Sequence, residues 1–256
     1  MKSARARRGE KLAPRVGNEG LHPRNIVTLR LDALPRARAL PGAAGRHTIA
    51  RMCNLYRMNS ATAEIAHLFG AAIDAGANVG TDIYPGYPGL VVAEGRVRSM
   101  VWGFPLTLKG KAGQQLKPKP VNNARTDKLT SGFWRSSFEH RRCLIPVSAF
   151  AEAEGPAGAK TRTWFSMPGQ PMLACAGIWR DSAEWGAVYS MVMTDGSPEI
   201  ELIHDRMPVI LAGAGQQQWL NGTPEEAFDL CVPYTGALAI DPTSQPWNAR
   251  KPSPIA

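Results

Sequence analysis

The residue with the most distinctive chemical potential is Cys53, because it directly follows Met52. If Met52 is the translation start, removal of the methionine exposes Cys53 as the first residue. A free N-terminal cysteine carries an amine with a pKa of about 7.7 to 8.0 and a thiol with a pKa of about 8.5 on adjacent carbons. Both groups are then partly available as nucleophiles near neutral pH. By residue type alone, the ordinary alternative is a buried structural cysteine.

Four further clusters combine polar, charged or aromatic side chains near the ends of expected strands. They are Trp102-Gly103-Phe104-Pro105, Asn122-Asn123-Ala124-Arg125, Glu152 after the apolar run 142–146, and His204-Asp205-Arg206 before another apolar run. Taken singly, each has an ordinary structural explanation, such as aromatic packing in a core or a solvated glutamate. A carboxylate among apolar residues, however, acquires a raised pKa, which suits proton transfer.

In order and spacing, these residues resemble the SOS response-associated peptidase (SRAP) family. The resemblance covers about residues 52 to 240. Bacterial and animal members of the family shield abasic sites in single-stranded DNA. The matching segments are Met-Cys at 52–53, Trp-Gly-Phe-Pro at 102–105, Asn-Ala-Arg at 123–125, Arg-Cys-Leu-Ile-Pro at 142–146 followed by Glu152, and His-Asp-Arg-Met-Pro at 204–208.

The resemblance implies four catalytic residues. Cys53 matches the nucleophile that forms the DNA crosslink, and Asn123 matches the asparagine that hydrogen-bonds the opened sugar. Glu152 matches the acid/base carboxylate, and His204 matches the histidine beside the sugar ring oxygen. The aromatics that usually flank the glutamate are replaced by Ala151 and Ala153.

The resemblance also implies a DNA-binding set. Arg125 and Arg206 match phosphate-binding arginines, and Trp102 lies in the aromatic segment that supports the bent strand, where bases are expected to stack on it or on Phe104. Many members read Met-Cys-Gly-Arg where this chain reads Met-Cys-Asn-Leu. One phosphate contact is therefore missing, and Arg57 is its expected replacement.

The function that follows is protection of abasic sites in single-stranded DNA, in the DNA damage response, by a covalent thiazolidine formed at Cys53. The enzyme class is crosslinking with peptidase (hydrolase) and lyase-like chemistry, and neither a cofactor nor a metal is expected. One alternative is a thiol peptidase or autopeptidase that uses Cys53, Glu152 and His204. Another is a non-catalytic nucleic-acid-binding module driven by a basic arm.

These residues need a framework of short strands. Ser60 to Phe69 predicts a helix that ends at Gly70, and 215–220 predicts a second one. Strand-like runs recur at intervals too short for crossover helices, which favours an antiparallel, β-dominated α+β domain with a few peripheral helices. The stretch 109–120 reads as a polar, basic loop. The expected strands are 90–93, 98–103, 142–146, 163–167, 172–179 and 187–193.

Composition limits the remaining possibilities. The 256 residues are 44% hydrophobic and 20% charged, and no run approaches the ~20 apolar residues needed to cross a bilayer. Cys53, Cys143, Cys175 and Cys231 form no CxxC pair, so neither a zinc site nor a redox motif is indicated. A monomer in a reducing, cytoplasmic setting, associated with the bacterial nucleoid, is expected.

The net charge of +9 comes entirely from the first 51 residues, which hold twelve basic and three acidic residues, whereas 52–256 hold 18 of each. Residues 1–51 show no helical or strand periodicity and are predicted to be disordered. They can be a nucleic-acid-binding arm, an organelle transit peptide, or upstream sequence translated from a misplaced start. The expected SRAP-like domain is 52–240, followed by an irregular tail at 241–256.

Overall fold

The computed structural model describes residues 53–249. The predictions for Met52 and for the basic extension 1–51 lie outside the described residues. Strands dominate the described part, and the helices are short. The helices are α1 Thr62–Phe69, α2 Arg135–His140, α3 Pro198–Glu201, α4 Gly215–Asn221 and α5 Pro224–Asp229, with a 3-10 turn at Thr126–Lys128.

Two sheets and one hairpin contain all the named strands. The strands are β1 Tyr56–Arg57, β2 Ala72–Ile73, β3 Asp82–Ile83, β4 Pro88–Ala93, β5 Arg96–Trp102, β6 Phe104–Leu106, β7 Lys119–Val121, β8 Asn123–Arg125, β9 Arg142–Val147, β10 Ala149–Glu154, β11 Thr161–Ser166, β12 Leu173–Ser182, β13 Gly186–Asp195, β14 Arg206–Pro208 and β15 Ala239–Pro246. The predicted strand-dominated α+β class is confirmed.

The larger sheet follows the order β14-β13-β12-β9-β4-β5-β2. Because β13 also pairs with β5, the strands β5, β4, β9, β12 and β13 close into a small barrel. Closure removes the free edges that an open sheet would expose. Most pairings are antiparallel, as expected, but three are parallel: β13 pairs in parallel with both β5 and β8, and β2 pairs in parallel with β5.

The smaller sheet has the order β15-β11-β10-β1-β3. Strand β1 pairs with β10, with Tyr56 opposite Phe150, and this pairing places the residues just before β1 beside the second half of β10. At the other edge, β15 pairs with β11 and runs to Pro246. The expected boundary at residue 240 therefore falls inside a paired strand, and the start of the predicted irregular tail is ordered.

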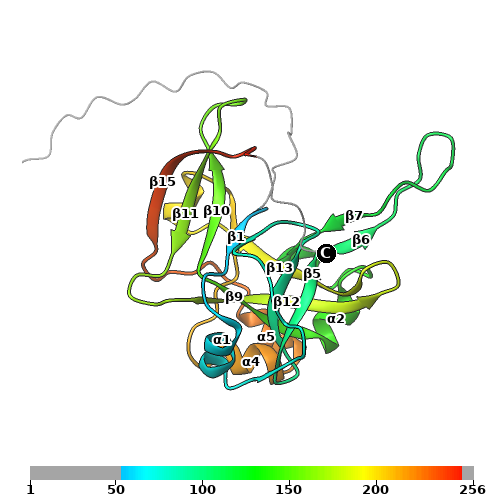
Figure 1. Ribbon diagram of the computed structural model, residues 1–256, viewed down its shortest axis with the longest axis horizontal. Helices are drawn as coiled ribbons and strands as arrows, with labels where there is room; N and C mark the ends of the chain where they lie inside the picture. The colour runs from blue at the N-terminus through cyan, green and yellow to red at the C-terminus, as the bar shows by residue number, and fades with distance from the viewer. Residues whose placement is uncertain (1–52, 250–256) are drawn as a thin grey trace, which may run out of the picture. The chain divides into compact units, whose positions relative to one another are not determined.

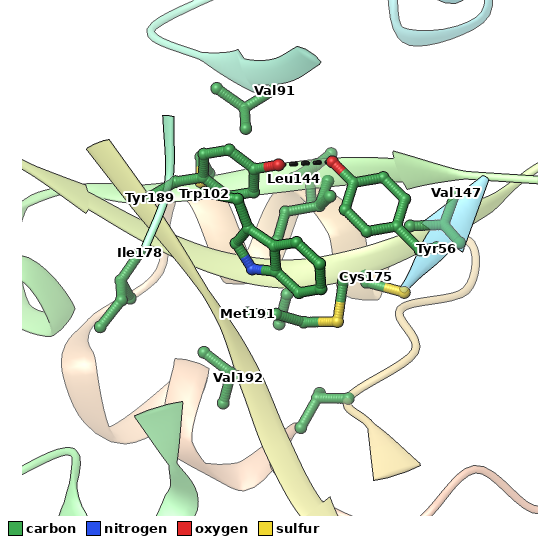
Figure 2. Close-up of a cluster of buried hydrophobic side chains, with 14 of the residues drawn as sticks. Tyr56, Val91, Trp102, Leu144, Val147, Cys175, Ile178, Tyr189, Met191 and Val192 are labelled. Carbon is green, nitrogen blue, oxygen red and sulfur yellow. Dashed lines mark hydrogen bonds between the residues drawn. The ribbon is translucent and has the colours of Figure 1, made fainter. Parts of the chain in front are cut away.

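An aromatic cluster fills the core of the barrel (Figure 2). The Trp102 ring meets Tyr56 edge-on at 5.0 Å and stacks with Tyr189 at 6.5 Å between ring centroids. The Tyr56 and Tyr189 hydroxyls hydrogen-bond each other at 2.5 Å. Gly89 on β4 lies against both hydroxyls, where a β-carbon would overlap them. This cluster fixes β1 to the barrel wall and so fixes the chain that follows Cys53.

The segment expected as a basic loop, 109–120, is mostly loop, and it connects the two strands of a hairpin. Strands β6 and β7 pair with Phe104 opposite Val121, and a further bridge joins Lys109 to Gln115. Figure 1 shows this hairpin, hereafter the β6–β7 arm (104–121), extending away from the barrel. Its lysines are therefore carried on an ordered element.

Candidate functional site

Cys53 lies immediately before β1 and is completely buried. Two side-chain amides hold its main chain: Nδ2 of Asn123 donates to the Cys53 carbonyl at 2.7 Å, and Nδ2 of Asn122 donates to the same oxygen at 3.1 Å. Asn123 begins β8, whose parallel pairing with β13 places it opposite Met191. The barrel thus clamps the backbone of the predicted nucleophile.

Glu152 lies beside Cys53 because of the β1–β10 ladder. The Ala151 amide donates to the Leu55 carbonyl at 3.0 Å, which continues the strand pairing toward Cys53. The Glu152 side chain has no exposed surface, and burial raises the pKa of its carboxyl well above the usual value, a shift that the nearby Cys53 thiol partly opposes. A buried carboxyl with a raised pKa is suited to proton transfer.

His204 faces the same carboxyl. Its Nε2 lies 3.9 Å from Oε2 of Glu152, and its side chain is 11% exposed. On the other side of the ring, the Arg206 amide donates to Nδ1 at 3.0 Å, and the Arg206 carbonyl lies 3.1 Å from the same nitrogen. In the neutral ring, Nδ1 accepts from the Arg206 amide and the proton is on Nε2. In the charged ring both nitrogens carry a proton, and Nδ1 faces the Arg206 carbonyl as a donor. In both states Nε2 presents a proton toward Glu152.

The polar atoms of this site lack partners within the protein. Six buried side-chain nitrogen or oxygen atoms in the described part of the chain have no hydrogen-bond partner, and four of them are Oδ1 of Asn123, both carboxyl oxygens of Glu152 and Nε2 of His204. Buried polar groups are almost always hydrogen-bonded in native proteins, so a concentration of exceptions needs an explanation. These four atoms cluster around Cys53, where they are available to hydrogen-bond a polar ligand.

The thiol of Cys53 is in an environment that disfavours the thiolate. Burial raises its pKa well above the usual value, and the negative charge of Glu152 raises it further. The thiol donates a hydrogen bond to the Leu55 carbonyl at 3.6 Å. Reactive cysteines usually show the opposite shift, caused by a neighbouring cation or a helix N-terminus.

Trp102 and Phe104 are not placed as the sequence suggested. Both side chains are completely buried, so neither offers a face on which a base can stack, and the expectation of direct stacking is corrected. Trp102 instead supports the site: its indole Nε1 donates to the Asn122 carbonyl at 2.9 Å. Asn122 in turn bonds Cys53 and, at 3.1 Å, Oδ1 of Asn54.

Asn122 is a site residue that sequence reasoning missed. It stands next to Asn123 in the Asn-Asn-Ala-Arg segment, but the choice between the two asparagines depends on which side of the extended chain each faces. Here the irregular step between β7 and β8 lets both amides reach the Cys53 carbonyl. The sequence feature that could have identified Asn122 was the pair of adjacent asparagines at 122 and 123.

Two of the three predicted phosphate-binding arginines lie close together. Arg125 and Arg206 sit on β8 and β14, which flank β13 on its two sides. Arg125 pairs with Asp127 at 2.9 Å, and Arg206 pairs with Asp195 at 2.8 Å. Burial acts to raise the pKa of the Asp127 carboxyl, but Arg125 chiefly, then Lys128 and Arg206, lower it overall. The two guanidinium groups thus share one electrostatic environment.

Arg57 is engaged elsewhere. Its guanidinium lies 3.7 Å from the centroid of the Trp164 ring, and its Nε bonds Asp82 at 2.9 Å. The side chain is 30% exposed. The structure therefore does not bring Arg57 to the Glu152–His204 cluster, and its predicted replacement of the missing arginine stays a prediction.

With this geometry established, comparisons with known proteins define the family. The profile of the SOS response associated peptidase (SRAP) family matches residues 52–249. The chain belongs to this family. As an SRAP protein, it is 27% identical over 150 residues to abasic site processing protein YobE of Bacillus subtilis, a stretch that covers 54% of this chain and 66% of YobE.

Other relatives agree with this assignment. The chain is 29% identical over 121 residues to abasic site processing protein YoqW of Bacillus subtilis, which covers 44% of this chain and 54% of YoqW. The SRAP chain thus matches about half to two thirds of the length of these curated relatives.

Two solved structures share the fold. A protein of Bordetella bronchiseptica superimposes with a TM-score of 0.64 at 24% identity and covers 75% of this chain and 99% of its own. A Bacteroides thetaiotaomicron protein gives 0.62 at 18% identity, with 74% and 91% covered. At these identities the likeness concerns the fold alone.

The described residues contain neither a metal-binding cluster nor a membrane-spanning helix. No group of three or more His, Cys, Asp or Glu side chains within 53–249 is arranged to hold a metal ion. Likewise, no helix in this range is long and apolar enough to cross a membrane.

Proposed function

We propose that this SRAP protein captures abasic sites in single-stranded DNA as a covalent thiazolidine formed at Cys53. The observation that carries the proposal is the group of unpartnered, buried polar atoms of Asn123, Glu152 and His204 around a cysteine whose main chain is clamped. The names of the curated relatives, abasic site processing proteins, supply the substrate class.

The chemistry begins with the sugar. An abasic deoxyribose is mainly a closed hemiacetal in equilibrium with a little open aldehyde. The protonated ring of His204 donates from Nε2 to the ring oxygen while the proton of the anomeric hydroxyl passes to the Glu152 carboxylate, so the carbon–oxygen bond of the ring breaks and the aldehyde forms. The free Oδ1 and remaining amide hydrogen of Asn123 hydrogen-bond the opened sugar, holding its aldehyde against Cys53.

Bond formation then needs two nucleophiles on one residue. The Cys53 amine attacks the aldehyde carbon to give a carbinolamine, and Glu152 donates the proton with which hydroxide leaves as water. The resulting imine is attacked by the Cys53 sulfur, whose proton passes to the imine nitrogen through Glu152. Aldehyde and aminothiol thus become a thiazolidine and one water, with no oxidant or cofactor required.

The ring explains why the product protects DNA. An open imine acidifies the neighbouring C2′ proton and leads to strand scission, whereas the saturated thiazolidine carries no such activation. Closure of this five-membered ring requires an amine and a thiol on adjacent carbons. A chain in which the residues before Cys53 remain attached has an amide nitrogen there, which cannot form the imine.

The raised thiol pKa favours this function over a thiol peptidase. A peptidase nucleophile is activated as a thiolate by a neighbouring base or cation, but here burial raises the pKa of the Cys53 thiol well above the usual value. In the proposed reaction the amine attacks first, and the thiol needs to lose its proton only against an adjacent electrophilic imine. Removal of the residues before Cys53 by the same site remains the alternative use of Cys53, Glu152 and His204.

DNA binding is assigned to the basic residues of the described part. Arg125 and Arg206 are proposed to contact phosphates near the reacting sugar, and the β6–β7 arm carries four lysines and no acidic residue between 104 and 121. Neutralised phosphates release counterions, which supplies much of the affinity for a single strand. An equal overall count of acids and bases in 52–256 is compatible with such local clustering.

Substitution of the nucleophile tests the proposal. Cys53→Ser and Cys53→Ala, prepared with a free amine at residue 53, keep the amine and lose the sulfur. We expect both to form an imine with abasic single-stranded DNA that borohydride traps, but no heat-stable conjugate without reductant. A stable conjugate from either variant in the absence of reductant would exclude the thiazolidine.

A further inference from the structure

A pocket of about 340 Å³ is lined by Arg180, whose guanidinium covers the ring of Phe104, the first residue of the β6–β7 arm. Its walls come from α2, the residues around it, and the end of β12. The residues that matter are Phe133, Ser136, Ser137, Arg141, Arg180 and Asp181. None of them belongs to the site around Cys53 or to the proposed DNA-binding residues.

Arg180 is the side chain that makes this pocket unusual. Its guanidinium carbon lies 4.2 Å from the centroid of the Phe104 ring and 4.8 Å from that of Phe133. Burial lowers the pKa of Arg180, and Glu184 partly offsets this shift. Among the described residues no carboxylate lies within ion-pair distance of Arg180, and no hydrogen bond uses its five N–H groups. Stacking on rings orients an arginine fork while leaving its donors available.

The rest of the pocket adds donors but little opposing charge. Arg141 pairs with Asp181 at 2.7 Å, so these two charges neutralise each other and Arg180 remains as the net positive charge. Arg141 is itself held against the Trp179 ring at 4.8 Å. Ser136 and Ser137 line the same wall, and Ser137 is almost completely buried. A planar cationic fork with hydroxyl donors matches a tetrahedral oxyanion such as a phosphate group.

The position of the pocket indicates which phosphate it would meet. Phe104, which Arg180 covers, is the first residue of the β6–β7 arm, so the pocket lies at the root of an element with four lysines and no acid. Phe104 also follows Trp102 and Gly103, and Trp102 reaches the Cys53 clamp through Asn122. The pocket is therefore connected, through Phe104, to the arm along which a strand bound at Cys53 is proposed to lie.

We propose that the Arg180 pocket binds a backbone phosphodiester of the nucleic-acid strand, at a distance from the abasic nucleotide. The inference rests on the proposed function and extends it by naming a second contact point. The inference predicts that the affinity for single-stranded DNA depends on how many nucleotides extend beyond the abasic site. Arg180 here is a binding residue and takes no part in the reaction at Cys53.

The test compares the full chain with its Arg180→Gln variant on single strands that carry a tetrahydrofuran, a non-reactive abasic analogue. One strand has about 4 nucleotides and the other about 16, the range of single-strand site sizes. On the long strand we expect Arg180→Gln to bind about tenfold more weakly, the effect of one charge-assisted contact. The slope of log affinity against log salt should also fall by about 0.7. On the short strand the two proteins should bind equally.

Two further variants keep the test decisive. Arg96→Gln removes one exposed positive charge at the start of β5 and controls for net charge, so it should leave the difference between long and short strands unchanged. Ser136→Asp places a negative charge on an exposed wall residue without disturbing the stacked arginine, and should weaken only long-strand binding. If Arg180→Gln and Ser136→Asp both match Arg96→Gln on both strands, the inference is wrong.

Inorganic phosphate distinguishes the two sources of a phosphate group. If phosphate raises the thermal midpoint of the wild-type chain but not of Arg180→Gln, while long-strand binding is unaffected by the substitution, the pocket binds a free anion and the nucleic-acid assignment fails. If the wild-type chain binds neither strand, the proposed function fails with the inference. If the Arg180 effect appears but no thiazolidine forms at Cys53, only the proposed chemistry fails.

Discussion

Glu152 and His204 differ from ordinary core residues in that Nε2 of His204 lies 3.9 Å from Oε2 of Glu152 and both atoms are buried without a hydrogen-bond partner among the described residues. We assign both to proton transfer, which typically contributes about 10² to 10⁴ in rate. Glu152→Gln and His204→Ala, each with a free Cys53 amine, should therefore slow conjugation by such factors at saturating abasic DNA. Their affinity for DNA should change little.

The measurement for this prediction is the single-turnover conjugation rate as a function of pH. By microscopic reversibility, His204→Ala should also slow release of the conjugated protein. If both variants matched the wild type in rate and in pH profile, the two residues would be structural, and the intrinsic reactivity of the aminothiol would be the only catalyst.

Burial of Glu152 also predicts how stability depends on pH. Its pKa is raised in the folded state, so the folded protein binds the proton more tightly than the unfolded chain, where the pKa is about 4.3. Its stabilising effect is fully present below that value and is lost as pH rises through the folded pKa. Within this window the free energy of unfolding should fall by up to about 1.4 kcal/mol per pH unit.

Urea unfolding of the wild type and of Glu152→Gln between about pH 4 and about pH 8 measures this effect, since Gln cannot titrate. The wild type should lose stability relative to the variant as pH increases. Parallel pH profiles for the two proteins would mean that the carboxyl titrates normally in the folded state.

At this scale the sequence predicted chemistry better than contacts. The resemblance to the SRAP family selected Cys53, Asn123, Glu152 and His204, and the structure places these four side chains together. The roles of Asn122 and Trp102 could not be predicted, because an amide clamp and a buried indole depend on the irregular step between two strands.

At the scale of the elements, the site depends on how β1 is attached to the barrel. Tyr56 carries this attachment through its hydroxyl bond to Tyr189 and its edge contact with Trp102. Gly89→Ala would place a methyl group against both tyrosine hydroxyls. We expect a loss of about 1 to 3 kcal/mol in the free energy of unfolding, the usual cost of overpacking a core.

Chemical denaturation of Gly89→Ala against Gly215→Ala measures this loss. Gly215 is a matched control, because a β-carbon there meets Leu230 at an ordinary 3.6 Å. Equal stabilities of the two variants would show that the tyrosine pair can move aside and does not hold β1 in place.

The longer elements were predictable from local patterns. The apolar runs at 90–93, 142–146 and 187–193 all lie within observed strands, and the predicted helix at 60–69 appears as Thr62–Phe69 with Gly70 in a left-handed conformation. The two- and three-residue strands and the parallel pairings were not predictable. They are defined by partners distant in sequence, as β8 is by β13, and carry too few residues for a periodic signal.

For the whole molecule, the distribution of charge carries the functional argument. The chain has a net charge of +9, but all of it lies before Met52, and the body has equal numbers of acids and bases. DNA binding by residues 52–256 must therefore depend on where the basic residues of this range lie in the fold. Their concentration on the β6–β7 arm, on the strands that flank β13 and at Arg180 depends on the tertiary fold, so it could not be predicted from composition.

The most direct test of the central claim is the intact mass of the conjugate formed on abasic single-stranded DNA by two chains, one that begins at Cys53 and one that retains the preceding residues. We predict that the chain with a free Cys53 amine gives a heat-stable species whose mass is the sum of protein and DNA less one water, without reductant. The chain that retains the preceding residues should give none until they are removed. Conjugation of that uncleaved chain at the same rate, through any residue, would contradict the account.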